Sequence, residues 1–259
     1  NVDAIDYCTF GNSKPFRIKI RNILNDNYTY FYVKKADASR VYGLELEHIL
    51  SPHSIYFLIY KDTLIEEHIA GIAGDVFIRD FLPKCSESEK SQIAKEFVKF
   101  KERCLVRLLG DMRSYNYVIA PTHDFDQIVY KIRAIDFDQQ SFEGNLKVYD
   151  LQFMRENREM IEMINDKLKT SSIIQYKIEE RSFMAKRMIM YPNRIDSLLN
   201  CMKNDVISYP ENIKTLKKQV EDYTNDPKFS ECENMGDILE SILAFVKRNY
   251  LNISNKELF

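Results

Sequence analysis

The middle of the chain carries carboxylate and amide side chains in a pattern suited to phosphoryl transfer. Asp111 and Asn116 lie in the run G-D-M-R-S-Y-N at residues 110–116, and Asp136 lies in the run I-D-F-D at residues 135–138. Phosphoryl transfer needs an acceptor hydroxyl placed near a carboxylate, and phosphates neutralised by Mg²⁺. An Asp and an Asn on one loop can do both jobs, and a second Asp after an apolar strand supplies another oxygen ligand for Mg²⁺.

Each motif also has an ordinary explanation when it is taken alone. A D-x-x-x-x-N spacing arises by chance in many proteins, and a strand that ends in Ile-Asp-Phe-Asp can simply run into a solvated turn. The order of the two motifs and the two strand-like segments between them, residues 117–120 and 128–135, favour the joint interpretation. We therefore treat the two motifs as one candidate site.

Together the two motifs resemble the protein-kinase-like superfamily, most closely its aminoglycoside-phosphotransferase and choline-kinase branch. That branch has a G-D-x-x-x-x-N loop, a strand pair and an I-D-F/W-x segment, and the resemblance covers residues 10–145. It implies ATP and Mg²⁺ as cofactors, Asp111 as catalytic base, and Asn116 and Asp136 as metal ligands. The chain departs from the family at Leu109, where a His is common, and in a long connector at residues 121–126.

An upstream strand offers the lysine that the resemblance places on the ATP phosphates. Lys34 ends this strand, and alternation puts it on the same face as Tyr32, whose ring could then lie against adenine. Lys35 is the rival lysine on the opposite face, and a solvated pair of lysines is the ordinary alternative. The following helix offers Glu47 first, and Glu45 second, as the ion-pair partner of the lysine.

Two further segments are expected to complete the nucleotide site. Ser13 lies in the run G-N-S-K, where the family has its nucleotide-covering loop, and such a loop can offer backbone N–H groups to phosphate. An ordinary turn fits this run equally well. The run L-I-E-E-H-I-A-G at residues 64–71 resembles the hinge between the lobes, with backbone groups near Glu67 and Ile69 at the adenine edge. We interpret His68 as a hinge residue, since Asp111 already supplies a base.

The elements that must position these residues follow from the apolar patterning and the turn residues. Strands are predicted at residues 16–20, 28–34, 55–60 and 63–68, and a helix at residues 38–50. Helices are predicted at residues 75–82 and 88–109, and from residue 151 onward, with breaks at Pro192, Pro210 and Pro227. The resulting expectation is an α+β, two-lobed, protein-kinase-like fold. Residues 1–71 form a small antiparallel-sheet N-lobe, and residues 72–259 form a mostly helical C-lobe with a catalytic hairpin and a helical C-terminal extension.

Composition excludes several other classes of protein. The 259 residues carry a formal net charge of −2, which argues against a general nucleic-acid binder because phosphate neutralisation needs a basic excess. The five cysteines are scattered and form no C-x-x-C pair, so neither a disulfide framework nor a zinc site is expected, and His48, His53 and His123 lack metal-ligand spacing. The scattered cysteines indicate a reducing cytoplasm, and we find no apolar run of membrane-spanning length and no signal-peptide pattern. The sequence begins at Asn1, which leaves room for a natural amino terminus further upstream.

Three functions remain compatible with these observations. The first is a small-molecule kinase acting on a hydroxyl of an aminoglycoside-like, choline-like or sugar-like compound. The second is an atypical protein Ser/Thr kinase, since the missing A-P-E segment argues only against the eukaryotic type. The third is an inactive kinase-like interaction protein, which the joint presence of Lys34, Asp111, Asn116 and Asp136 disfavours. An acidic acceptor cleft would indicate a cationic substrate, and a long open groove would indicate a peptide.

Overall fold

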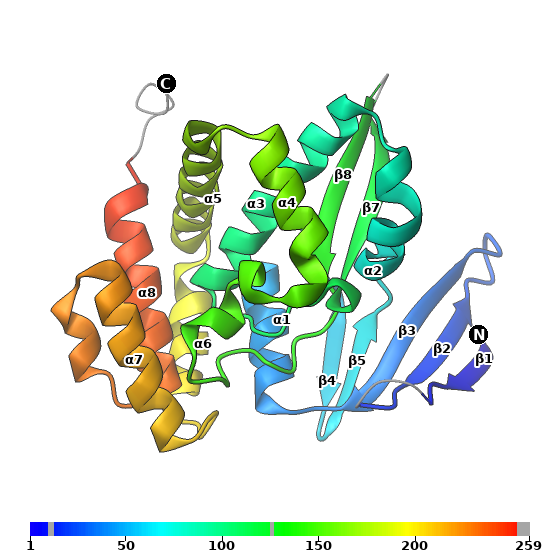
Figure 1. Ribbon diagram of the computed structural model, residues 1–259. Helices are drawn as coiled ribbons and strands as arrows, with labels where there is room; N and C mark the ends of the chain where they lie inside the picture. The colour runs from blue at the N-terminus through cyan, green and yellow to red at the C-terminus, as the bar shows by residue number, and fades with distance from the viewer. Residues whose placement is uncertain (10–12, 125–126, 253–259) are drawn as a thin grey trace.

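Strands open the chain and helices complete it (Figure 1). The computed structural model describes residues 1–9, 13–124 and 127–252. The first sheet is antiparallel with strand order β1-β2-β3-β5-β4, and its strands are β1 Val2–Tyr7, β2 Phe16–Arg21, β3 Tyr28–Lys35, β4 Phe57–Tyr60 and β5 Thr63–Glu67. The predicted strands at residues 16–20, 28–34, 55–60 and 63–68 are confirmed apart from small differences at their ends. Strand β1 was not predicted, because two of its six residues are Asp, which is uncommon in strands.

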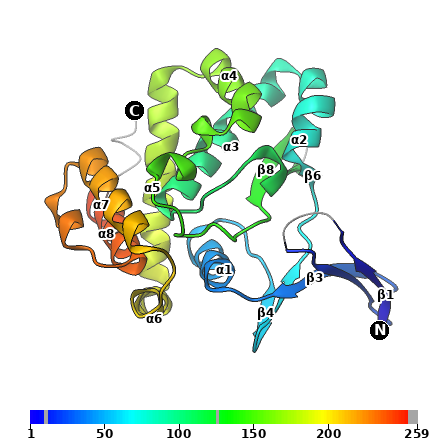
Figure 2. The same ribbon diagram turned by 60° about the horizontal axis from the view of Figure 1, so that its bottom comes forward.

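Helix α1, Ala38–Leu50, has the bounds that the sequence predicted. Its first turn is capped by Asp37, whose side chain accepts a hydrogen bond of 2.9 Å from the backbone N–H of Arg40. Figure 2 shows the helix between the first sheet and the C-terminal helices. Leu44 belongs to the apolar core around the strands, whereas Leu46 and Ile49 belong to the core formed by the C-terminal helices. Helix α1 therefore joins the two cores.

The second sheet is a long hairpin with a short extra strand. Its order is β6-β7-β8, with β6 Ile72–Ala73, β7 Tyr117–Asp124 and β8 Gln127–Ala134. The predicted connector at residues 121–126 is wrong in its first part, because β7 continues to Asp124. Proline is tolerated in this strand because β6 pairs only with Ile119 and Val118. Pro121 therefore has a partner strand on one side alone and needs no N–H for a second.

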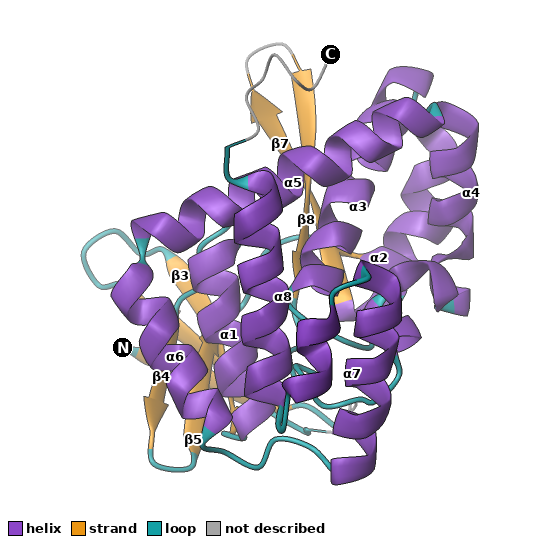
Figure 3. Cartoon of the chain, turned by 90° about the vertical axis from the view of Figure 1, so that its left-hand side faces the viewer, coloured by secondary structure: helices purple, strands orange, loops and turns teal. Residues whose placement is uncertain are grey.

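Helices make up most of the remaining chain, and Figure 3 shows α5, α6, α7 and α8 packed in front of the strands. The longer helices are α3 Glu87–Val106, α4 Arg158–Lys167, α5 Thr170–Met190, α6 Pro192–Lys203, α7 Pro210–Thr224 and α8 Met235–Tyr250. The predicted helix at residues 75–82 consists of the short α2 Gly74–Val76 followed by a π-helical turn and a 3₁₀ turn. The 3₁₀ turns later in the chain are Ser114–Asn116, Leu146–Tyr149, Leu151–Phe153, Arg155–Asn157 and Pro227–Glu231. Pro192 and Pro210 each open a helix, where the missing N–H costs nothing.

The α+β class is confirmed, with the strands concentrated in the first half of the chain and the helices in the second. No helix in the described part of the chain combines the length and the apolar character needed to cross a membrane.

A buried ion pair fixes helix α1 against the helical part of the protein. The Arg107 guanidinium donates to the Glu47 carboxylate, and both side chains are almost fully buried. Burial alone would raise the pKa of Glu47, but the positive charges of Arg107 and Arg103 outweigh it and hold the pKa below its usual value. The carboxylate is therefore charged at neutral pH, and each member of the pair is costly to bury without the other.

We expect Glu47→Gln to destabilise the fold by about 3–5 kcal/mol at neutral pH, because it leaves the buried Arg107 charge uncompensated. A folded-state pKa below the unfolded value contributes stability above the ordinary carboxylate pKa, and this stability is lost as the pH falls through the lowered value. The difference between parent and variant should therefore shrink in acid. Urea unfolding at several pH values measures both effects.

Glu45→Gln is the matched control on the same helix. Glu45 pairs at 2.7 Å with Arg194, which is partly exposed, so its loss should cost less than about 1 kcal/mol. Equal losses in the two variants would show that the Glu47 pair does not fix the helix.

Candidate active site

The residues predicted to bind nucleotide come together around one pocket. This inter-sheet pocket has a volume of about 320 Å³ and is lined by residues of both sheets and of the segments that join them. The lining includes seven of the predicted residues, namely Ser13, Tyr32, Lys34, Glu67, Ile69, Asn116 and Asp136. Asp111 lies outside this lining, at the start of the loop that ends at Asn116. The structure thus brings a lysine, an amide and a carboxylate together from distant parts of the chain.

Lys34 has the orientation that strand alternation predicted. Its side chain lines the inter-sheet pocket and is only 6% exposed, whereas Lys35 is exposed. Tyr32 lines the same pocket, and its ring packs edge-on against His68 with 5.6 Å between centroids. Strand β3 therefore presents one lysine and one aromatic ring to the pocket.

The predicted ion-pair partner of Lys34 is wrong. Lys34 Nζ lies 2.5 Å from Glu66 Oε1, while Glu47 pairs with Arg107 and Glu45 pairs with Arg194. The reason is the register of the sheet, in which Lys34 lies opposite Leu64. Glu66 is then the diagonal neighbour of Lys34 on the same face, within reach of its long side chain.

Glu66 was missed because the family resemblance directed attention to the helix. Alternation along β5 was the available signal, since it puts Leu64 and Glu66 on one face. Burial raises the pKa of Glu66, and the Lys34 ammonium opposes this shift. Among the described residues Glu66 Oε2 is buried without a hydrogen-bond partner, so it can accept a hydrogen bond from a ligand in the pocket.

The loop that begins at Asp111 is held by backbone hydrogen bonds from several sides. Asp111 has a φ of 54°, a left-handed conformation that costs a non-glycine residue free energy. Its N–H donates to the Val148 carbonyl at 3.2 Å, and its own carbonyl accepts from the Arg113 N–H at 2.8 Å. Leu109, where the family often has His, is fully buried and bridges to Gln140. Backbone contacts therefore position Asp111 here.

Asn116 links this loop to the second motif. Its side-chain Nδ2 donates to the Asp111 carbonyl at 2.8 Å, which leaves Oδ1 as the ligand oxygen. Its backbone carbonyl accepts from the Ile135 N–H at 3.0 Å, directly before Asp136. Both Asn116 and Asp136 line the inter-sheet pocket. One short hydrogen-bonded unit therefore connects the predicted base with the two predicted metal ligands.

Arg113 is a charged residue of this loop that the sequence reasoning did not select. Its Nε lies 2.7 Å from Asp111 Oδ1, and its Nη1 lies 3.3 Å from Glu156 Oε1. The hydrogen bond to Asp111 raises the pKa of Arg113, so the guanidinium stays charged beside the predicted base. The sequence feature that could have identified Arg113 is its basic side chain two positions after Asp111.

Helix α1 holds the segment that carries Asp136. Gly43 makes the approach possible, because a Cβ at this position would lie 2.8 Å from Phe137 Cβ. Arg40 Nη2 lies 3.3 Å from Asp138 Oδ2 and so ties the start of the helix to the same segment. Burial and the nearby Asp136 charge raise the pKa of Asp138. Asp136 lines the inter-sheet pocket, and its Oδ1 accepts a hydrogen bond of 3.4 Å from the backbone N–H of Asp138.

The donor set fits magnesium better than a transition metal. In the described part of the chain no three His, Cys, Asp or Glu side chains gather as a metal cluster. Asn116 and Asp136 instead offer an amide oxygen and a carboxylate. Mg²⁺ is commonly held by one or two carboxylates together with phosphate oxygens and water, so a small oxygen set of this kind suits it.

A second depression includes Asp111 in its lining. It has a volume of about 650 Å³, and it is lined by Asp111, Arg113, Gln139, Glu143, Lys147, Val148, Phe153 and Met154. Two acidic and two basic side chains line it, so the lining has no excess of negative charge. We name it the acceptor depression, because Asp111 is the predicted base.

The predicted loop and hinge residues are only partly described. Gly11 and Asn12 lie outside the described residues, while Ser13 lines the inter-sheet pocket. Ile69 also lines it. The backbone N–H of Glu67 donates to the Tyr56 carbonyl at 2.8 Å, so that N–H is already used within the sheet.

The sequence was compared with protein-family models and with curated proteins. No protein-family model matches the sequence, and no curated protein is significantly similar to it.

Proposed function

We propose that the protein is an ATP- and Mg²⁺-dependent phosphotransferase that moves the γ-phosphate of ATP to a hydroxyl acceptor. The observation that carries the proposal is the convergence of Lys34, Asn116 and Asp136 on one pocket, with Asp111 at the other end of the Asn116 loop. These are the side chains that phosphoryl transfer requires, and the chain brings them together from three separate segments.

Each residue has a distinct task in this proposal. Lys34 neutralises phosphate charge from the β3 side of the pocket, and Glu66 holds its ammonium in place. Asn116 and Asp136 hold Mg²⁺, which supplies charge neutralisation and orientation of the phosphates. Asp111 orients the acceptor hydroxyl and takes its proton. Arg113 donates from Nε to Asp111 Oδ1 and so orients the carboxylate.

The balanced charge of the acceptor depression bears on the acceptor. Its acids are Asp111 and Glu143, and its bases are Arg113 and Lys147. A polycationic, aminoglycoside-like acceptor would be better matched by an acidic cleft. We therefore favour a small hydroxyl compound that is neutral or carries both signs of charge, such as a sugar-like one. A protein Ser or Thr acceptor is the second candidate, and an inactive kinase-like protein would bind nucleotide without turnover.

Mg·ATP should raise the thermal stability of the protein, because a ligand that binds only the folded state stabilises it by mass action. The gain is about 2.7 kcal/mol at one hundred times Kd. Asp136→Asn should lose most of the Mg²⁺-dependent part of this gain, as measured by titration calorimetry with and without Mg²⁺.

Asp196→Asn is the control, because it makes the same change at an exposed position of α6. If the parent protein showed neither a thermal shift nor heat of binding with saturating Mg·ATP, the nucleotide proposal would fail.

Asp111→Asn should retain Mg·ATP binding and lose turnover by about 10²–10⁴-fold, because the amide cannot take the hydroxyl proton. Transfer of labelled phosphate from ATP into a metabolite pool, and then into a protein pool, measures turnover and separates the two acceptor classes. Near-parental transfer by this variant would remove Asp111 from the base role.

Replacing Lys34 tests the nucleotide side without relying on the Asp111 loop. Lys34→Met alone would leave the buried Glu66 without its ion-pair partner. We therefore expect the double variant Lys34→Met/Glu66→Gln to retain more of the stability of the fold. Its kcat/KM for ATP should fall by at least about tenfold, the equivalent of about 1.4 kcal/mol of lost transition-state binding.

Lys35→Met is the matched control on the same strand, and its exposed side chain lies outside the pocket lining. Similar losses in the double variant and in Lys35→Met would contradict the role of Lys34.

A further inference from the structure

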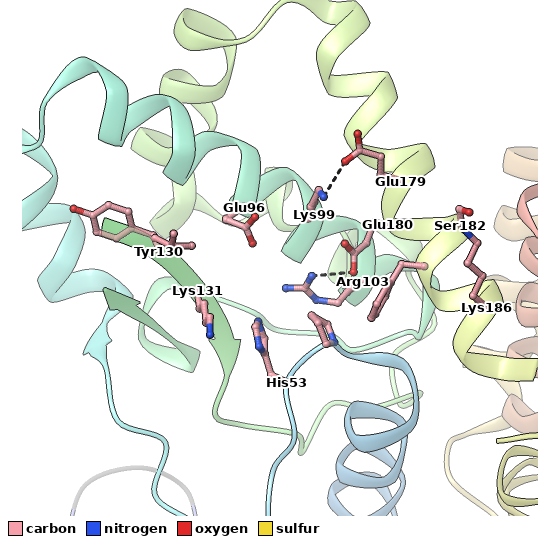
Figure 4. Close-up of a pocket in the computed structure, with 13 residues that line it drawn as sticks. His53, Glu96, Lys99, Arg103, Tyr130, Lys131, Glu179, Glu180, Ser182 and Lys186 are labelled. Carbon is pink, nitrogen blue, oxygen red and sulfur yellow. Dashed lines mark hydrogen bonds and ion pairs between the residues drawn. The ribbon is translucent and has the colours of Figure 1, made fainter. Parts of the chain in front are cut away.

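A second pocket lies away from the proposed active site and shares no lining residue with the inter-sheet pocket. It has a volume of about 460 Å³, opens to solvent, and is lined by residues of α3, α5, β8 and the turn that follows α1 (Figure 4). We call it the α3–α5 pocket. Its volume falls within the range of small-molecule sites, and it greatly exceeds the space that one inorganic ion needs.

The positive and negative charges that line this pocket do not cancel. Two of its cations are paired within the wall: Arg103 Nη1 lies 2.9 Å from Glu180 Oε1, and Lys99 Nζ lies 2.9 Å from Glu179 Oε2. Lys131 and Lys186 also line the pocket, and within the described chain neither forms an ion pair. The remaining charged side chains of the lining are these two exposed lysines and one acid, Glu96.

Glu96 contributes less negative charge than its formal charge suggests. Burial raises the pKa of Glu96, and the opposing effect of Arg103 and Lys99 is smaller. The neutral form of this carboxyl is therefore easier to reach, and in that form it can donate a hydrogen bond. The pocket keeps an excess of positive charge.

His53 supplies an unused hydrogen-bonding group in the same space. Its Nε2 is buried, and no partner for it lies among the described residues. Burial, together with the charge of Arg103, lowers the pKa of His53 to about 4, so the ring is neutral at physiological pH. Figure 4 shows His53 and Lys131 close together below Arg103, with Glu96 above Lys131. A buried polar atom without a partner is costly, and a ligand in this pocket could satisfy it.

Apolar groups line another part of the wall. Phe183 of α5 and Pro52 of the turn after α1 both line the pocket, with Val129 of β8. A site with cations and a histidine beside an aromatic ring matches a ligand that has an anionic group and a planar apolar part.

We propose that the α3–α5 pocket binds a small organic anion, whose phosphate or carboxylate group contacts Lys131, Arg103 and His53 and whose apolar part packs on Phe183. The site is separate from the proposed nucleotide and acceptor regions and does not depend on the proposed function. Phosphate and carboxylate share the recognition chemistry, because guanidinium and ammonium groups donate to both.

The test uses the full chain and three probes: inorganic phosphate, phenyl phosphate and benzoate. We expect phenyl phosphate to bind more tightly than inorganic phosphate, and to shift the NMR signals of the His53 ring. The ratio between phenyl phosphate and benzoate distinguishes a phosphate site from a carboxylate site. Binding should weaken as salt is added, because the contacts are charged.

Lys131→Gln should weaken phenyl phosphate binding by about tenfold or more, which corresponds to losing about 1.4 kcal/mol. Phe183→Leu should weaken the binding of phenyl phosphate but not of inorganic phosphate. Lys218→Gln is the control, because Lys218 is an exposed lysine of α7 that lies outside the pocket. Arg103 is left unchanged, since removing it would strand the buried Glu180.

Two results would overturn the proposal. The first is the absence of any His53 shift with all three probes at concentrations about tenfold above a weak Kd of about 1 mM. The second is binding that survives in Lys131→Gln but disappears in Lys34→Met/Glu66→Gln or under saturating Mg·ATP, which would place the anion in the inter-sheet pocket.

Discussion

The buried ion pair between Glu47 and Arg107 is the interaction on which the candidate site most depends. A charge in a low-dielectric interior needs a partner, so the pair joins helix α1 to the C-terminal end of α3. Two contacts of α1 then act on the second motif: the close approach of Gly43 to Phe137 and the Arg40–Asp138 ion pair. The position of Asp136 is therefore coupled to a pair of residues that never reaches the pocket.

This use of Glu47 explains why Lys34 needs a different partner. In the kinase-like pattern that the sequence resembles, a helix glutamate pairs with the lysine. Glu47, the residue predicted for that role, instead pairs with Arg107 at the end of α3. The neighbouring strand supplies Glu66 instead, at the diagonal position that the register of the sheet provides. The Lys34 ammonium is therefore held by the sheet to which it belongs.

Local patterns in the sequence predicted the elements well, and long-range partners poorly. Helix α1 begins after a capping Asp and has a clear apolar face, so its bounds could be read directly. The side of the sheet to which the Lys34 side chain points could be predicted from strand alternation alone. The pairing of Lys34 with Glu66 depends on the register of β3 against β5, and the pairing of Glu47 depends on the distant Arg107, so no single short segment encodes either. Strand β1 and the extension of β7 through Pro121 were missed because their residues suit a strand only in context.

The structure also bears on the choice between a functional site and two ordinary turns. A solvated turn would leave its side chains free, but Phe137 is buried and Asp138 is tied to α1. Asp111 adopts a left-handed conformation, in which its N–H donates to the Val148 carbonyl and its own carbonyl accepts from Arg113 N–H and Asn116 Nδ2. These hydrogen bonds and the burial of Phe137 show that both motifs are ordered parts of the fold, and this order argues against two solvated turns on grounds that are independent of the family resemblance.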